Sequence, residues 1–211
     1  MPIFYQQDID ECTKLAVWKI TETEEFFLSE VPLQRAITHP QKRLQHLAGR
    51  YLLKYLFADF PLSLIRIADT RKPFLHDEVY HFSISHCGDF AAAIVSKKKR
   101  VGVDIELVSK KVTSVLHKFL SDEEQLQFSS ALNDQPQCYA TLFWSCKEAV
   151  FKWYGLGSVD FRKHIVVKQV TGCPNHCYLT SINFNKNEDL YLDLHSQFLG
   201  GVCLSYVVTG T

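Results

Sequence analysis

The sequence has no net charge, no long apolar run and no targeting pattern, and each absence excludes a class of protein. The 23 Lys and Arg residues balance the 23 Asp and Glu residues, so the formal net charge at pH 7 is zero. Because positive charge is not in excess, the chain as a whole does not attract nucleic acid or an acidic membrane, and an anionic ligand needs a local cluster of cations. No run of about 18 apolar residues is available to span a membrane, and the N-terminus lacks the charged-then-apolar order of a signal peptide. We therefore expect a cytoplasmic chain that binds neither membrane nor nucleic acid.

The cysteines do not form the even, regularly spaced set of a disulfide-stabilised secreted protein. A reducing cytoplasm is the simplest environment for them. Residues 173–177 contain two cysteines and His176, but a structural zinc site needs four ligands, and no second Cys/His pair stands at a suitable spacing. We interpret this segment as a β-turn with incidental thiols. The seven cysteines are Cys12, Cys87, Cys138, Cys146, Cys173, Cys177 and Cys203.

The hydrophobic pattern predicts an α+β protein, and 211 residues suit one large domain or two small lobes. Apolar residues recur at helical spacing over residues 41–57 and 139–154. Ser121 followed by Glu124 has the capping-box pattern of another helix start. Alternating or apolar runs predict strands at 15–20, 64–68, 79–85, 90–96, 101–107, 165–170, 177–184, 189–195 and 202–208.

A weak internal repeat favours two similar lobes. The tetrapeptides that begin at Phe27 and Phe119 both read Phe-Leu-Ser followed by an acidic residue, and each precedes a long helix and then strands. The lobes would meet near residues 97–110. Because one chain would supply both lobes, we expect a monomer.

An acidic strand is expected at residues 101–107. Strict alternation turns the apolar residues from Val101 to Leu107 toward a core and places Asp104 and Glu106 on the opposite face. The two carboxylates, about 7 Å apart along a strand, repel each other unless a cation lies near them. Oxygen ligands without nearby Cys or His favour Mg²⁺, which takes one or two carboxylates plus phosphate oxygens. A sheet face turned to solvent is the alternative.

Two helices carry polar faces whose roles the pattern alone leaves open. On the helix at 41–57, Arg43 and Arg50 share a basic face. This face is either exposed to solvent or part of a phosphate-binding site. A phosphate-binding site would need further phosphate-binding residues nearby.

The helix at 139–154 has an apolar stripe that should be core. Trp144, Glu148, Phe151 and Lys152 lie on the other side. Glu148 and Lys152 at this spacing form at least a surface ion pair. The two aromatics indicate instead that the face is covered, by another lobe or by a ligand.

Four short motifs follow one another along the chain: Arg71-Lys72-Pro73-Phe74, Phe82-Ser83-Ile84-Ser85-His86, Gly102-Val103-Asp104-Ile105-Glu106 and Trp144-Ser145-Cys146-Lys147-Glu148-Ala149-Val150-Phe151-Lys152. Together they resemble the 4′-phosphopantetheinyl transferases of the surfactin-activating (Sfp-like) type. With the Ala48-Gly49-Arg50 helix they cover about half of the chain. Two departures stand out: Arg71 replaces a glycine, which alters the backbone approach to a phosphate, and Ser83 replaces an asparagine at the nucleotide. The corresponding segments of the family read, in the same order, Gly-Lys-Pro-Tyr, Phe-Asn-Ile-Ser-His, Gly-Val-Asp-Ile-Glu and Trp-x-x-Lys-Glu-Ala-x-x-Lys.

The resemblance implies a pseudo-two-fold pair of α+β lobes, each a small, mostly antiparallel sheet packed with a long helix. The lobes would comprise residues 1–100 and 101–211, with coenzyme A in the cleft between them. The enzyme would transfer the 4′-phosphopantetheine arm of coenzyme A to a serine of an apo acyl or peptidyl carrier protein and release adenosine 3′,5′-bisphosphate. Which carrier protein of fatty-acid, polyketide or nonribosomal peptide synthesis it serves is not readable from these residues.

The resemblance also implies roles for individual residues. Asp104, Glu106 and Glu148 would hold Mg²⁺ against the pyrophosphate, where the metal acts as Lewis acid and template. Glu148 would be the base for the incoming serine, directly or through a metal-bound water, and Lys152 would stabilise the leaving phosphate. The expected contacts of coenzyme A are Arg43, Arg50, Arg71, Lys72, Pro73, Ser83, Ser85, His86, Asp104 and Lys152.

Two other functions fit the same residues. A Mg²⁺-dependent hydrolase of a nucleotide-like pyrophosphate would use the three carboxylates with water in place of serine. A non-catalytic binder of carrier proteins would retain the fold, although none of the three carboxylates is missing from the sequence.

Overall fold

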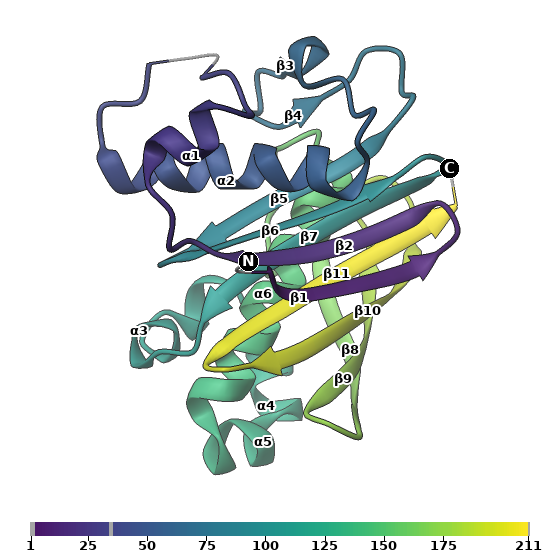
Figure 1. Ribbon diagram of the computed structural model, residues 1–211. Coiled ribbons are helices and arrows are strands. Elements are labelled where there is room, and N and C mark those ends of the chain that lie inside the picture. The colour runs from purple at the N-terminus through teal and green to yellow at the C-terminus, as the bar shows by residue number, and fades with distance from the viewer. Residues whose placement is uncertain (1–2, 34–35, 211) are drawn as a thin grey trace. The chain divides into compact units, whose positions relative to one another are not determined.

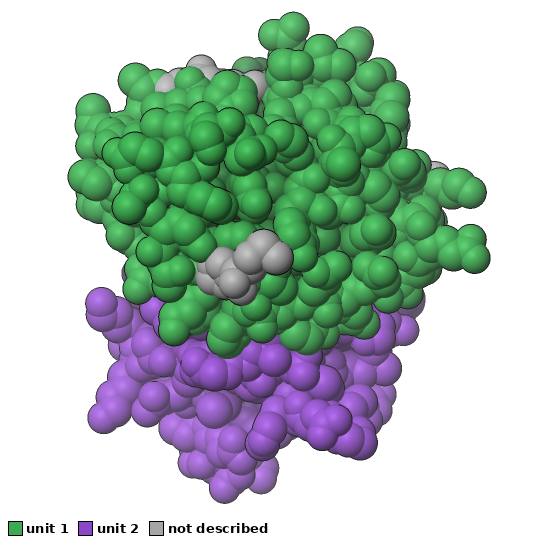
Figure 2. Space-filling model, in the orientation of Figure 1, with its two compact units in different colours: residues 1–105, 208–211 green, residues 106–207 purple. Residues whose placement is uncertain are grey.

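A computed structural model describes residues 3–33 and 36–210 of the chain (Figure 1). The protein is a mixed α+β structure of antiparallel sheets and helices, as predicted. It divides into two compact units, which are coloured in Figure 2: residues 1–105 with 208–211, and residues 106–207. Strand β7 (Lys99–Leu107) carries the chain from the first unit into the second.

The first unit contains a four-stranded antiparallel sheet with the strand order β1-β2-β6-β5. The predicted strands at 15–20, 79–85 and 90–96 are confirmed with small shifts of their ends. The pattern at residues 3–12 did not predict β1, an edge strand that pairs only with β2 in this sheet. The strands are β1 (Ile3–Asp10), β2 (Thr13–Lys19), β5 (His81–Cys87) and β6 (Phe90–Ser96), and a separate pair is formed by β3 (Arg66–Ile67) and β4 (Pro73–Phe74).

Helix α2 (Pro40–Leu56) lies across one face of this sheet and confirms the predicted helix (Figure 1). Leu47, Ala48 and Leu52 on its inner side are fully buried. Gly49 is needed where α2 meets β5, because a Cβ atom there would lie 2.6 Å from Cγ2 of Ile84. The chain around the sheet also includes α1 (Glu24–Leu28) and the 3-10 helix η1 (Leu62–Leu64).

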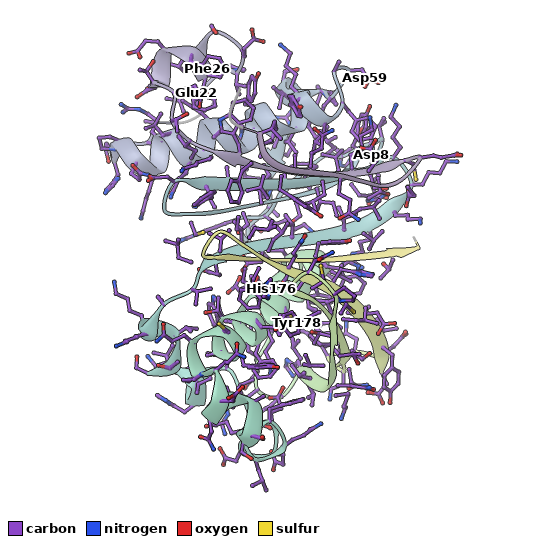
Figure 3. All side chains as sticks on the ribbon, turned by 60° about the horizontal axis from the view of Figure 1, so that its bottom comes forward. Asp8, Glu22, Phe26, Asp59, His176 and Tyr178 are labelled. Carbon is purple, nitrogen blue, oxygen red and sulfur yellow. The ribbon has the colours of Figure 1, made fainter. Side chains whose placement is uncertain are left out.

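An aromatic cluster fixes α1 to the first unit. The ring of Trp18 stacks on Phe26 at a centroid distance of 6.3 Å and meets Tyr51 edge-on at 5.1 Å. The indole N–H of Trp18 donates to Glu22, 2.9 Å away, and Figure 3 labels Glu22 and Phe26 beside each other in this region. These contacts hold a helix of five residues that is too short to be stable alone.

The second unit contains four consecutive antiparallel strands, which confirm the four predicted at the C-terminal end of the sequence. They pair in the order β11-β10-β9-β8. Residues 173–177 form the hairpin between β8 and β9, as predicted, with Asn175 and His176 at φ 62° and 57°. Tyr178, labelled in Figure 3, is the second residue of the return strand and packs edge-on against Phe198. The strands are β8 (Ile165–Cys173), β9 (Cys177–Phe184), β10 (Leu190–Leu199) and β11 (Val202–Gly210).

Helix α6 (Pro136–Tyr154) packs on β8 and β10 and confirms the second long helix. Its predicted core stripe is buried, with Leu142, Phe143 and Cys146 at 0% exposure. The helix ends at Gly155, whose φ of 74° is a left-handed conformation suited to glycine. The preceding short helices are α3 (Lys110–Thr113), the 3-10 helix η2 (Leu116–Lys118), α4 (Asp122–Gln127) and α5 (Ser129–Asp134).

The predicted capping box at the start of α4 is confirmed. The hydroxyl of Ser121 accepts from the Glu124 backbone N–H at 3.2 Å, and the Glu124 carboxylate accepts from the Ser121 backbone N–H at 2.8 Å. Among the described residues, no helix has the length and apolar character needed to cross a membrane.

Candidate active site

Strand β7 is the predicted acidic strand, but its second face is not turned to solvent. Val101, Val103 and Ile105 are buried as expected, and Asp104 on the opposite face is also only 2% exposed. Leu107 was expected in the core and is 45% exposed, because β7 ends there. The solvent-facing alternative for this strand is therefore wrong at Asp104.

Two serines of β5 hold the middle of β7 in place. The Ser85 hydroxyl donates to Oδ1 of Asp104 at 2.8 Å and accepts from the backbone N–H of Ile105 at 3.3 Å. The Ser83 hydroxyl accepts from the backbone N–H of Val103 at 3.2 Å. Both serines are buried. The contact of Ser83 with β7 was not predicted from the sequence.

Asp104 has a buried carboxylate on the part of β7 that belongs to the first unit. Burying a carboxylate is costly unless hydrogen bonds or a cation compensate. The Ser85 hydroxyl supplies one such bond and fixes the direction of Oδ1. A carboxylate oriented in this way is suited to bind a metal ion.

In the second unit, Trp144 links Glu106 to the helix that carries Glu148. The indole N–H of Trp144 donates to Oε1 of Glu106 at 3.0 Å. Trp144 and Glu148 are one turn apart on α6 and both line the same cavity. The contact therefore brings Glu106 to the side of α6 that bears Glu148.

No three His, Cys, Asp or Glu side chains among residues 3–33 and 36–210 form a cluster that could hold a metal ion. A magnesium site differs from such a cluster, because Mg²⁺ keeps water and substrate phosphates and needs only one or two protein carboxylates. The predicted set of Asp104, Glu106 and Glu148 is therefore not found as such a cluster, and what fits Mg²⁺ is the chemistry of these side chains, which offer only oxygen ligands.

The cavity beside Glu148 has a volume of about 870 Å³, and four of its eleven lining residues are aromatic. Trp144 meets Phe119 at a centroid distance of 5.2 Å and Phe161 at 5.6 Å, and Phe161 also contacts Phe151. The sequence predicted that another lobe or a ligand covers this helix face, whereas the structure shows aromatic residues of the same unit covering part of it. The cavity is lined by Val115, Lys118, Phe119, Trp144, Glu148, Phe151, Ser158, Val159, Asp160, Phe161 and Arg162.

The cations predicted on α2 occupy different surroundings. Arg50 is 6% exposed and its Nη1 lies 3.0 Å from Nδ1 of His46. Arg43 pairs with Glu24 at 2.6 Å and donates to the carbonyl of Ile37 at 3.1 Å. Arg43 therefore already has an acidic partner, which a phosphate would have to displace or share.

The turn between β3 and β4 carries Arg71 and Lys72, and Pro73 is the first residue of β4. Arg71 has φ of 67°, so it adopts the left-handed conformation that a glycine takes without strain. Burial, together with the nearby charge of Arg100, lowers the pKa of Lys72 to about 8. His86 lies near the end of β5 and is exposed.

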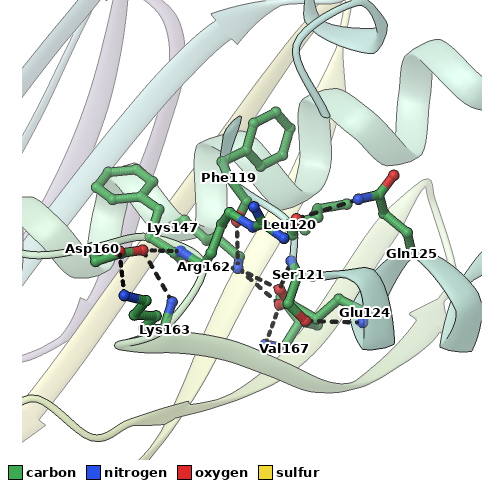
Figure 4. A network of polar contacts seen from close by, with 11 residues as sticks. Phe119, Leu120, Ser121, Glu124, Gln125, Lys147, Asp160, Arg162, Lys163 and Val167 are labelled. Atoms are coloured by element: carbon green, nitrogen blue, oxygen red, sulfur yellow. Dashed lines mark hydrogen bonds and ion pairs between the residues drawn. The ribbon is translucent and has the colours of Figure 1, made fainter. Parts of the chain in front are cut away.

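Lys147 is the polar residue of this region that sequence reasoning missed. Its side chain is fully buried, and its ammonium group lies 2.8 Å from a carboxylate oxygen of Glu124 (Figure 4). Burial lowers the pKa of Lys147 to about 8, and the charge of Glu124 opposes this effect. A signal was present, because Lys147 follows Phe143 by four residues and precedes Val150 by three, which places it on the apolar stripe of α6.

Comparisons with known proteins show which family the chain resembles. Residues 100–206 match the model of a family described as the 4′-phosphopantetheinyl transferase superfamily. The chain is 32% identical over 112 residues to enterobactin synthase component D of Salmonella austin, covering 53% of this chain and 47% of that protein. The corresponding protein of Escherichia coli K12 is 35% identical over 123 residues, covering 53% and 54%. The 4′-phosphopantetheinyl transferase gsp of Aneurinibacillus migulanus is 30% identical over 112 residues, covering 53% and 46%. The chain spans about half the length of the curated relatives it matches.

Proposed function

Because the chain belongs to the 4′-phosphopantetheinyl transferase superfamily, we propose that it moves the phosphopantetheine arm of coenzyme A onto a serine of an apo carrier protein. The second product would be adenosine 3′,5′-bisphosphate, and the motifs favour the Sfp-like type. The observation that carries the proposal is the pair of oriented carboxylates on β7. Asp104 is held by Ser85, and Glu106 is held by Trp144, one turn from Glu148.

We assign Asp104, Glu106 and Glu148 to the binding of Mg²⁺. The ion, when bound, would supply Lewis-acid chemistry at the pyrophosphate of coenzyme A. The hydroxyl of Ser85 and the indole of Trp144 keep two of the carboxylates in fixed orientations, so little reorganisation is needed on binding. Glu148 is the candidate base that accepts the proton of the acceptor serine, directly or through a water molecule.

The basic residues are assigned to the phosphates of coenzyme A. Lys152 lies one turn beyond Glu148 on α6, and its ammonium group would neutralise charge on the leaving bisphosphate. Arg50 is buried and Lys72 is partly buried, and desolvated cations bind phosphate more strongly than exposed ones. The remaining proposed contacts are Arg43, Arg71, Pro73, Ser83, Ser85, His86 and Asp104.

The cavity beside Glu148 supports the transfer reaction, because an uncharged part of a substrate could lie in it close to the carboxylate base. Its aromatic walls suit apolar atoms, and Lys118 and Arg162 supply positive charge at its lining. The phosphopantetheine arm and the acceptor segment of the carrier are the two groups that must approach Glu148. We propose that the cavity accommodates one of them during transfer.

The reaction is tested by incubating the protein with Mg²⁺, coenzyme A and a panel of apo acyl and peptidyl carrier proteins. Intact-protein mass spectrometry should show a carrier that gains one phosphopantetheine arm, and omission of Mg²⁺ should prevent the gain. Release of adenosine 3′,5′-bisphosphate without any carrier would favour the pyrophosphate hydrolase instead. A chain that binds a carrier and leaves coenzyme A intact would be the non-catalytic binder.

Coenzyme A binding is expected to weaken as the pH rises through about 8, because Lys72 loses its charge there in the free protein. Below that pH the ammonium group is charged and binds phosphate fully. Above it, binding must take up a proton, so the dissociation constant should rise by up to about tenfold per pH unit. Calorimetric titration in two buffers of different ionisation enthalpy measures both the dissociation constant and the number of protons taken up on binding.

The Lys72→Arg variant is the control, because a guanidinium group stays charged throughout this range. Its coenzyme A affinity should be nearly independent of pH between 7 and about 9. Lys147, whose pKa also lies near 8, is present in both proteins and cannot produce the difference. An identical pH dependence in the two proteins would remove Lys72 from the phosphate site.

A further inference from the structure

We propose that Lys147 is a positioning residue. It holds two segments that line the cavity in fixed positions relative to Glu148, and its loss affects turnover rather than coenzyme A binding. The inference rests on the proposed transfer function. Lys147 touches neither substrate nor metal in this scheme. It acts through the backbone of the residues that surround the base.

The ammonium group of Lys147 has three donors and three acceptors from separate segments of the second unit (Figure 4). It donates to the carbonyl of Phe119 at 2.8 Å, to the carbonyl of Phe161 at 2.9 Å and to the carboxylate of Glu124 at 2.9 Å. Phe119 precedes α4, whereas Phe161 lies in the segment between α6 and β8. One side chain therefore ties both segments to α6.

Both of the carbonyl acceptors belong to cavity residues. The rings of Phe119 and Phe161 pack against Trp144, which in turn holds Glu106. Glu148 is the next residue after Lys147 on the helix. Loss of the ammonium group would therefore release two segments that line the same cavity as Glu148.

Glu124 completes the arrangement from the other side. Its Oε1 accepts from the backbone N–H of Val167 at 2.8 Å, and its Oε2 accepts from the backbone N–H of Ser121 at 2.8 Å. The carboxylate thus joins the start of α4 to β8 while it compensates the charge of Lys147. Because a buried ion pair often stabilises a fold less than apolar residues of similar size would, stability alone is a weak reason for this pair.

The test compares Lys147→Met with the double variant Lys147→Met/Glu124→Gln. The single variant leaves a buried, uncompensated carboxylate, whereas the double variant removes both charges. We expect the double variant to regain part of the lost melting temperature. Its kcat should nevertheless stay about 10- to 100-fold below that of the unmodified protein, with little change in the KM for coenzyme A, because the two carbonyls still lack their donor.

Leu194→Ala provides a control for destabilisation without loss of a polar contact. Leu194 is fully buried on β10 and does not line the cavity. The variant should lower the melting temperature while retaining kcat, provided that all assays are run well below the lowest melting temperature of the set. If kcat follows the melting temperature across all variants, Lys147 is merely structural and the proposal is overturned.

Acrylamide quenching of Trp144 fluorescence gives a readout that does not depend on activity. Opening of the Phe119 and Phe161 walls should increase quenching in the double variant, and the increase should vanish in a Trp144→Phe background. Increased quenching with no transfer by the unmodified protein would reject the proposed function and retain the positioning role. Normal transfer by the unmodified protein, with unchanged quenching and unchanged kcat in the double variant, would reject the positioning role and retain the proposed function.

Discussion

Asp104→Asn is expected to lower the transfer rate about 10²- to 10³-fold, because it removes a negative charge assigned to Mg²⁺ without changing the shape of the side chain. The amide oxygen of Asn can still accept the hydrogen bond that Ser85 donates to Oδ1 of Asp104. The fold should therefore persist, and the loss should be visible in kcat measured by mass spectrometry of the carrier. Raising the Mg²⁺ concentration should recover part of the rate.

Asp193→Asn is the matched control. Asp193 also accepts a hydrogen bond from a serine hydroxyl, that of Ser181 at 2.7 Å, but it lies exposed on β10. The same chemical change there should leave the transfer rate and its Mg²⁺ dependence unaltered. Undiminished turnover in Asp104→Asn would contradict the assignment of Asp104 to the metal, whatever happens to Asp193→Asn.

Glu124→Ala is expected to lower the free energy of unfolding by about 3–5 kcal/mol, because it leaves the fully buried ammonium group of Lys147 without a charge partner. The substitution also removes the acceptor for the backbone N–H groups of Ser121 and Val167. Urea denaturation should show the loss as a lower midpoint. A loss of this size is a large fraction of the stability of an ordinary domain.

Asp122→Ala tests whether the loss belongs to the buried pair or to α4 in general. Asp122 begins the same helix and pairs at 3.1 Å with Arg162, but its side chain is 87% exposed. Because solvent screens such a pair, the midpoint should shift far less than in Glu124→Ala. Equal shifts in the two variants would show that the buried pair contributes nothing specific.

The sequence by itself determined the elements whose causes are local. The capping box at Ser121, the apolar stripe of α6 and the tight turn at residues 173–177 depend on residues within a few positions of one another, and all three are present as predicted. The four motifs that resemble the family are equally local. The motifs at 102–106 and 144–152 lie within residues 100–206, which the family model matches, whereas those at 71–74 and 82–86 lie outside that region.

Tertiary structure decided which polar residues are buried and what they bind. The acceptors of Lys147 are 14, 23 and 28 residues away along the chain, so no local pattern could identify them. Asp104 likewise receives its hydrogen bond from Ser85, on another strand. Burial of a charge depends on partners that only the folded chain brings together. The motifs therefore predicted the chemistry of the carboxylates. Packing decided which groups hold Asp104 and Glu106, and it buried Lys147 among its three acceptors.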